Sequence, residues 1–319
     1  MFLPRFSPRL VALSLAVIGS VLFAAKGILA KLMYREGIDA TTLLALRMLL
    51  SLPFFAVMAA LTWRNQPRLV RSDVWKIAGL GFIGYYVSSY LSFLGLTYIS
   101  VGLERLILFL TPTVVALLGM VFYKQRIART QWLSMALAYA GIVLVFWNDT
   151  HVTGAPAGRI ALGAAIVFAA ALTYGVYLLQ SGEVVRRYGS VRLVSLAMLV
   201  STAYTLVHYV VVSPHHQIAD LFEQTSSVWG LSAINAVVCT VVPMTLLMAA
   251  VSRLGAATAA QAGMAGPVAT LFLGYVFLQE AITPLQLAGT ALVMGGMVVL
   301  ARVKVNNTDV SKNMLKNNV

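Results

Sequence analysis

Apolar residues in this chain form long runs that are separated by short polar segments. Ten runs predict helices, with spans 10–31, 41–62, 75–98, 102–122, 131–148, 159–181, 192–212, 228–250, 255–277 and 284–302. A helix needs about 20 apolar residues to cross a bilayer, and the runs have that length. The first run continues past Lys26, which is too long for the apolar core of a signal peptide, so it predicts a retained helix. The pattern predicts an all-α integral membrane protein with ten transmembrane helices.

The composition supports this class. Of the 319 residues, 60% are hydrophobic and 10% are charged, whereas a soluble domain has about 45–50% apolar and about 25% charged residues. A soluble enzyme, a nucleic-acid-binding domain and a disordered protein are therefore excluded, and the expected partner is the lipid bilayer. The single cysteine, Cys239, excludes an internal disulfide and a multi-cysteine metal site. We expect no cofactor and no metal. The sequence pattern does not indicate an oligomeric state.

The net charge of +13 does not indicate nucleic-acid binding, because Lys and Arg cluster between the apolar runs. Four of the 23 basic residues lie within or at the ends of runs. Of the others, seventeen fall on the side of the N-terminus, and only Arg35 and Arg159 fall on the opposite side. Basic residues accumulate in the cytoplasmic segments of membrane proteins. Both termini are therefore predicted to be cytoplasmic, and residues 303–319 are predicted to form a polar cytoplasmic tail.

The chain also repeats itself. Residues 110–146 align with residues 265–301 at a constant offset of 155, with eleven identities in 37 positions, and Pro112 falls on Pro267. The matching segments are five spans apart, and an odd number of spans reverses the direction of the chain. The alignment thus predicts two inverted five-helix repeats, an architecture of transporters with a site near the bilayer midplane. The predicted repeats are residues 1–148 and 159–302.

Several segments resemble one family of membrane proteins. Residues 94–119, LGLTYISVGLERLILFLTPTVVALLG, resemble the junction of the third and fourth helices in EamA-like transporters of the drug/metabolite transporter superfamily. The segment Leu46-Arg47-Met48 resembles the Arg-containing second helix of that family, and Ala30-Lys31-Leu32 resembles the end of its first helix. The resemblance covers residues 10–302.

The second half carries the resemblance from Gly274 to Gly289, and the chain departs from the pattern where Gln125 stands opposite Glu280. The resemblance implies ten helices, cytoplasmic termini and transport of a small-molecule substrate across the bacterial inner membrane, mostly as efflux. It does not define the substrate.

Four charged residues fall within predicted spans: Lys26, Arg47, Glu104 and Arg105. A charge inside a bilayer is costly and is usually paired or functional. Helical side chains lean toward the helix N-terminus, so Arg47 and Arg105 lean outward and can reach the interface, whereas Lys26 leans inward. We expect Lys26 or Arg47 to pair with Glu104 in an outer gate, with Arg105 in the same group. Alternatively, Lys26 and Arg47 bind a substrate carboxylate.

Uncharged residues complete the candidate site. The paired prolines interrupt matching helices, where a freed backbone carbonyl needs a new partner, and such interruptions indicate a central site. Tyr86, Tyr90 and Phe93 share one helical face, and tyrosines at this depth need a wet cavity or polar neighbours. The alternative for each residue is interhelical packing. The expected cavity-lining residues besides Lys26 are Tyr86, Tyr90, Pro112, Asn235, Gln261 and Pro267.

These features predict a secondary transporter that exports small metabolites, such as amino acids or aromatic and amphipathic compounds, by alternating access. The chain has no P-loop motif, which excludes ATP as its own energy source, and no catalytic motif of an intramembrane enzyme. Every Asp is expected in a loop or the tail, so Glu104 is the only carboxylate expected within a span. Facilitated diffusion, exchange and proton antiport stay open. The alternatives are uptake or exchange of a carboxylated or phosphorylated metabolite, and a membrane-embedded receptor or assembly partner.

Overall fold

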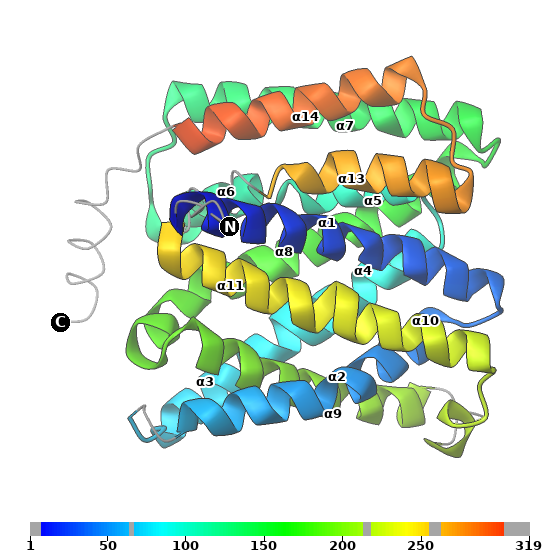
Figure 1. Cartoon of the computed structure of the whole chain (residues 1–319). Helices are drawn as coiled ribbons and strands as arrows, with labels where there is room; N and C mark the ends of the chain where they lie inside the picture. The colour runs from blue at the N-terminus through cyan, green and yellow to red at the C-terminus, as the bar shows by residue number, and fades with distance from the viewer. Residues whose placement is uncertain (1–7, 64–66, 213–217, 255–262, 303–319) are drawn as a thin grey trace, which may run out of the picture.

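The structure is a computed structural model that describes residues 8–63, 67–212, 218–254 and 263–302, and within these ranges its regular secondary structure is all helical, without a strand (Figure 1). The elements in chain order are α1 (Pro8–Arg35), α2 (Ala40–Trp63), α3 (Arg71–Gly81), η1 (Phe82–Val87), α4 (Ser88–Leu96), α5 (Val101–Leu108), α6 (Thr111–Tyr123), α7 (Arg129–Val152), α8 (Ala157–Tyr188), α9 (Ser190–Val212), η2 (Ile218–Leu221), α10 (Ser226–Ala236), η3 (Val237–Val241), α11 (Val242–Leu254), α13 (Ala265–Leu273), η4 (Gly274–Leu278) and α14 (Pro284–Arg302).

Eight helices among the described residues are long and apolar enough to cross a membrane. They correspond to the first eight predicted spans. Two shorter apolar helices, Ala265–Leu278 and Pro284–Leu300, lie where the ninth and tenth spans are predicted. The start of the predicted ninth span, including Gln261, lies outside the described residues, as does the predicted tail 303–319.

Helix ends follow local chemistry. Ser100 begins α5 as an N-cap, because its hydroxyl accepts the Leu103 N–H at 3.1 Å. The helix is interrupted at Phe109 and Leu110. The next helix, α6, has Pro112 in its first turn, where the missing N–H of proline costs no helical hydrogen bond. The fourth predicted span is therefore two helices, α5 and α6, that meet near the middle of the bundle.

The helices lie roughly side by side, with their axes aligned along the length of the bundle (Figure 1). The pair α7 and α14 lies along one edge, and α2 with α9 along the opposite edge, with α1, α4, α8 and α13 between them. The most extensive packing joins α7 to α14, α2 to α9, α1 to α11 and α4 to α8. We call the end where α1 begins and α14 ends the proximal end, and the end where α1 stops the distal end.

Two local features recur at the spacing of the sequence repeat. Lys124 and Gln279 are the only described non-glycine residues with positive φ, at 52° and 60°, and they are 155 positions apart. Each follows the end of a helix as a left-handed cap. The π-helical segments η1 and η3 begin at Phe82 and Val237, which are also 155 positions apart.

One expectation about the carboxylates is wrong. Asp73 lies inside α3 and Asp149 inside α7, and both are buried rather than in loops. The helices extend beyond the predicted spans, and each carboxylate has partners there. Arg187 and Tyr188 bind Asp73 at 2.6 and 2.7 Å, and Asp149 accepts the Ser100 N–H at 3.2 Å. Glu104 is therefore not the only carboxylate within a span.

Candidate functional site

Three cationic side chains and one carboxylate meet in the interior of the bundle. Lys26 comes from α1, Arg47 from α2, and Glu104 and Arg105 from α5. Lys26, Arg47 and Glu104 are 6%, 4% and 3% exposed, and Arg105 is partly buried. We call these four residues the central cluster. Burying charges at this depth requires compensating partners.

Two aromatic rings connect the cations. The Lys26 ammonium lies 5.3 Å from the centre of the Phe23 ring and 5.0 Å from that of Phe93. The Arg47 guanidinium carbon lies 5.1 Å from Phe93, and that of Arg105 lies 5.3 Å from Phe23. The face of an aromatic ring attracts a cation, and this attraction is stronger where water is excluded. The rings therefore hold three positive charges close together without neutralising them.

Glu104 does not form the expected ion pair. Its Oε1 accepts a hydrogen bond from the Ser92 hydroxyl at 2.6 Å. Neither Lys26 nor Arg47 lies within 4.0 Å of a carboxylate oxygen among the residues that the structure describes. The central cluster thus combines three cations with one carboxylate, and it keeps an excess of positive charge. A gating role for these residues stays a prediction.

Buried polar atoms around the cluster lack partners within the described chain. They are Nε of Arg47, Nε of Arg105 and Oδ1 of Asn235. Asn235 is fully buried, and its amide nitrogen donates to the Lys26 carbonyl at 3.5 Å, so two of the expected cavity-lining residues lie side by side. An unsatisfied buried donor costs about 1–3 kcal/mol. Two guanidinium donors and one ammonium in such surroundings can hold an anionic group such as a carboxylate.

The predicted tyrosine face divides between two neighbourhoods. Tyr86 and Tyr90 contact the His208 ring of α9, with ring centres 5.7 and 4.7 Å apart. Phe93, which we placed on the same face, packs on Lys26 and Arg47 instead. These are edge-on ring contacts rather than hydrogen bonds, and Nδ1 of His208 has no hydrogen-bond partner among the described residues. Nothing in the sequence pattern singles out His208, since it is one polar residue in the apolar run 192–212.

The paired prolines take different positions. Pro112 is exposed on α6, whereas Pro267 is buried in the first turn of α13. Next to Pro267, a β-carbon on Gly266 would lie 2.8 Å from a terminal nitrogen of Arg105 and 2.9 Å from the Ser20 hydroxyl. The start of α13 thus borders the central cluster. Gln261 lies outside the described residues.

A second group of charges lies at the proximal end. All three ion pairs among the described residues lie here: Arg187 with Asp73 at 2.6 Å, Arg187 with Glu183 at 3.2 Å, and Lys76 with Glu183 at 3.2 Å. They join α3 to α8. The buried Arg192 of α9 also donates to the Pro67 carbonyl at 2.7 Å. The sequence pattern does not reveal this group, because it places these residues at or beyond the ends of the predicted spans and gives no partner for any of them.

The fold and its interior define a polytopic helical membrane protein with a buried, positively charged site. Comparison with known proteins gives the family: the EamA-like transporter family matches residues 10–147 and 161–302, and the chain belongs to it. The membership implied by the resemblance is confirmed.

The relatives agree with this assignment. The chain is 31% identical over 278 residues to an uncharacterized transporter of Bacillus subtilis (strain 168), across 86% of this chain and 87% of the relative. It is 27% identical over 233 residues to a protein of Streptantibioticus cattleyicolor named a probable terminal-alkyne amino-acid exporter, across 72% of this chain and 74% of the relative. One solved crystal structure has a TM-score of 0.62 at 17% identity, covering 91% of this chain and 97% of that chain, which shows a shared fold.

Proposed function

We propose that this chain is a secondary transporter that exports small metabolites bearing a carboxylate, with amino acids as the first candidates. The observation that carries the proposal is the central cluster, in which three cations share two aromatic rings while the one carboxylate is already bound by Ser92. A substrate carboxylate would supply the missing negative charge. The relative from Streptantibioticus cattleyicolor, named a probable amino-acid exporter, favours the same class of substrate.

Alternating access is supported by the packing of the two proposed halves, residues 1–148 and 159–302. In two inverted repeats, α1 corresponds to α8, and α4 to α11. The contact of α1 with α11 then has its counterpart in the contact of α8 with α4. The recurring caps at Lys124 and Gln279 favour the same relation. Two halves related in this way can open a shared site to either side in turn.

The proposed orientation has both termini in the cytoplasm of a bacterial inner membrane. Arg35 and Arg159 lie near the distal end, where α1 stops and α8 begins. Most other basic residues outside the spans lie near the proximal end, as cytoplasmic residues should. The proximal ion pairs then lie at the cytoplasmic end of the substrate path.

A thermal-shift screen of the purified protein tests the substrate class. A ligand that binds only the folded state raises the apparent melting temperature. We expect amino acids to do so, and nucleosides and phosphorylated metabolites not to. Lys26→Met should abolish the shift, whereas Lys124→Met, at an exposed lysine, should keep it. Stabilisation by phosphorylated metabolites alone would favour the uptake or exchange alternative. An amino-acid shift that is unchanged in Lys26→Met would contradict the proposed site.

A further inference from the structure

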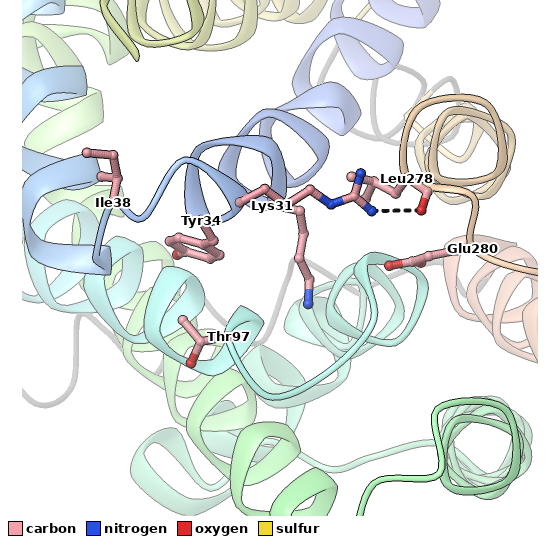
Figure 2. A pocket seen from close by; sticks show the side chains of 7 residues that line it. Lys31, Tyr34, Ile38, Thr97, Leu278 and Glu280 are labelled. Atoms are coloured by element: carbon pink, nitrogen blue, oxygen red, sulfur yellow. Dashed lines mark hydrogen bonds between the residues drawn. The ribbon is translucent and has the colours of Figure 1, made fainter. Parts of the chain in front are cut away.

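A separate cavity of about 400 Å³ opens at the distal end of the bundle (Figure 2). It is lined by Lys31, Tyr34, Arg35, Ile38, Thr97, Leu278 and Glu280. Its volume falls within the range of about 300–1,000 Å³ that is typical of small-ligand sites. Lys31 follows Lys26 by five residues, about 7.5 Å along the helix at 1.5 Å per residue. The cavity therefore lies beyond the central cluster on the way to the distal surface.

One side of this distal cavity is cationic. The Lys31 ammonium points into the opening in Figure 2 and has no hydrogen bond or ion pair to any residue within the described ranges. Arg35 donates from Nη2 to the Leu278 carbonyl at 2.9 Å, which fixes its guanidinium at the rim. A guanidinium has five N–H donors, so this bond leaves Arg35 further donors for a ligand.

The facing side carries one carboxylate, Glu280. Its Oε1 accepts the Val101 N–H at 3.3 Å, in the first turn of α5, and Figure 2 shows the carboxylate across the cavity from Lys31. The two groups are farther apart than the 4.0 Å of an ion pair. Opposite charges that face each other across an open space leave room for a ligand that carries both charges.

The floor of the cavity is aromatic. The Tyr34 hydroxyl donates to the Phe93 carbonyl at 2.7 Å, so the hydroxyl is engaged in the bundle while the ring borders the cavity. Ile38 and Leu278 add apolar surface. The Phe93 ring contacts both Lys26 and Arg47, so the Tyr34–Phe93 hydrogen bond links the floor of the distal cavity to the central cluster.

We propose that the distal cavity is an exit site for a zwitterionic α-amino acid, with its carboxylate between Lys31 and Arg35, its ammonium at Glu280 and its side chain against Tyr34 and Ile38. The inference rests on the proposed export function and adds a second site to it. A monocarboxylate would meet repulsion from Glu280, and a monocation would meet repulsion from Lys31. Only a ligand with both groups satisfies both sides.

Protection of a cysteine against labelling tests this site. Thr97→Cys in a Cys239→Ser background, reconstituted in lipid nanodiscs, is labelled by a charged maleimide with and without L-phenylalanine. We expect L-phenylalanine to slow labelling at least about fivefold, which corresponds to about 1 kcal/mol of discrimination. N-acetyl-L-phenylalanine and L-phenylalaninamide, which each keep one charge, should not protect at the same concentration. Labelling of Thr130→Cys, at the proximal end, should be unaffected.

Charge variants make the test specific. Lys31→Met should remove protection by L-phenylalanine, and Lys31→Arg should retain it, which separates loss of charge from loss of folding. Glu280→Gln should remove protection by L-phenylalanine and allow protection by the N-acetyl compound. Protection that survives Lys31→Met and Glu280→Gln but is lost in Lys26→Met overturns the exit site in favour of the central cluster alone.

Counterflow of labelled L-phenylalanine and L-leucine, measured in parallel, separates the two proposals. Flux without protection by either amino acid overturns the exit site and leaves the proposed transport function standing. Absence of flux for every amino acid tested overturns the proposed function itself.

Discussion

Gly141 of α7 and Gly289 of α14 meet backbone to backbone: a β-carbon on Gly289 would lie 2.6 Å from the Gly141 carbonyl oxygen, and one on Gly141 would collide with the Gly289 carbonyl. On the same pair of helices, the Ser134 hydroxyl donates to the Gly296 carbonyl. The offset of 155 carries Ser134 onto Gly289 and Gly141 onto Gly296. The two contacts are therefore counterparts of each other across the helix pair.

This reciprocity makes the α7–α14 contact a test of the packing. Gly141→Ala and Gly289→Ala should each lower the free energy of unfolding by about 1–3 kcal/mol, because the helices must separate to admit a methyl group. Gly295→Ala is the matched control on α14, since nothing lies within 4 Å of a β-carbon there. Alanine should leave that site unchanged or slightly stabilised. Equal melting temperatures for Gly289→Ala and Gly295→Ala would contradict the close contact.

The two carboxylates bound to Arg187 should differ in importance. Asp73 is 3% exposed and accepts two hydrogen bonds, whereas Glu183 is 50% exposed. Asp73→Asn should cost about 1–3 kcal/mol, because it weakens two charge-assisted hydrogen bonds at a buried site. Glu183→Gln should cost less than about 1 kcal/mol, as expected for an exposed pair. Melting temperatures in detergent check the order, and a larger effect at Glu183 would refute this explanation of how α3 and α8 are held together at the proximal end.

Glu104 should oppose binding of an anionic substrate. Its removal as Glu104→Gln leaves the cations of the central cluster without an opposing charge, while the amide can still accept from Ser92. We expect the dissociation constant of a carboxylate ligand to fall by about fivefold or more, which corresponds to about 1 kcal/mol. Isothermal titration of the purified variant measures this. Weaker binding would mean that Glu104 contacts the ligand itself, for example through an ammonium group.

Binding at the distal cavity should depend on pH. Burial raises the pKa of the Glu280 carboxyl above its ordinary value, against the lowering effects of the Val101 N–H and of Lys31 and Arg35, while Asp149 raises it further. The carboxyl therefore becomes neutral at a higher pH than an exposed glutamate, which titrates near about 4.3. As the pH falls through this raised pKa, the ammonium of L-phenylalanine loses its partner and protection of Thr97→Cys should weaken. Protection that stays unchanged as the pH falls, in protein that is still folded, would contradict a role for ionised Glu280.

The positions of most helices along the chain could be predicted, because the length of an apolar run can be read directly from the sequence. The eight long helices correspond to predicted spans, and the family resemblance seen around Arg47 and Glu104 was confirmed. The interruptions were predicted less well. Pro112 marks the interruption between α5 and α6, but the π-helical segment from Phe82 to Val87 contains no proline that would indicate it in the sequence.

The interior site was predicted only by residue type. A charge in an apolar run is visible in sequence, so Lys26, Arg47 and Glu104 were identified, and Asn235 does lie beside Lys26. The partner of each charge depends on which helices pack together, and this packing cannot be read from a single sequence. Glu104 therefore took Ser92 rather than a cation as its direct partner. The distal cavity was missed for the same reason, since Glu280 is far from Lys31 along the chain.

The most direct test of the account is counterflow in proteoliposomes. Vesicles loaded with an unlabelled amino acid should take up the labelled form transiently, and only when the protein is present. Lys26→Met should abolish this uptake, because it removes a buried cation that has no carboxylate partner within the described structure, and Lys124→Met should preserve it. Uptake that is unchanged in folded Lys26→Met, or absent in the wild-type protein for every amino acid, would contradict the claim that the central cluster carries a carboxylate substrate across the membrane.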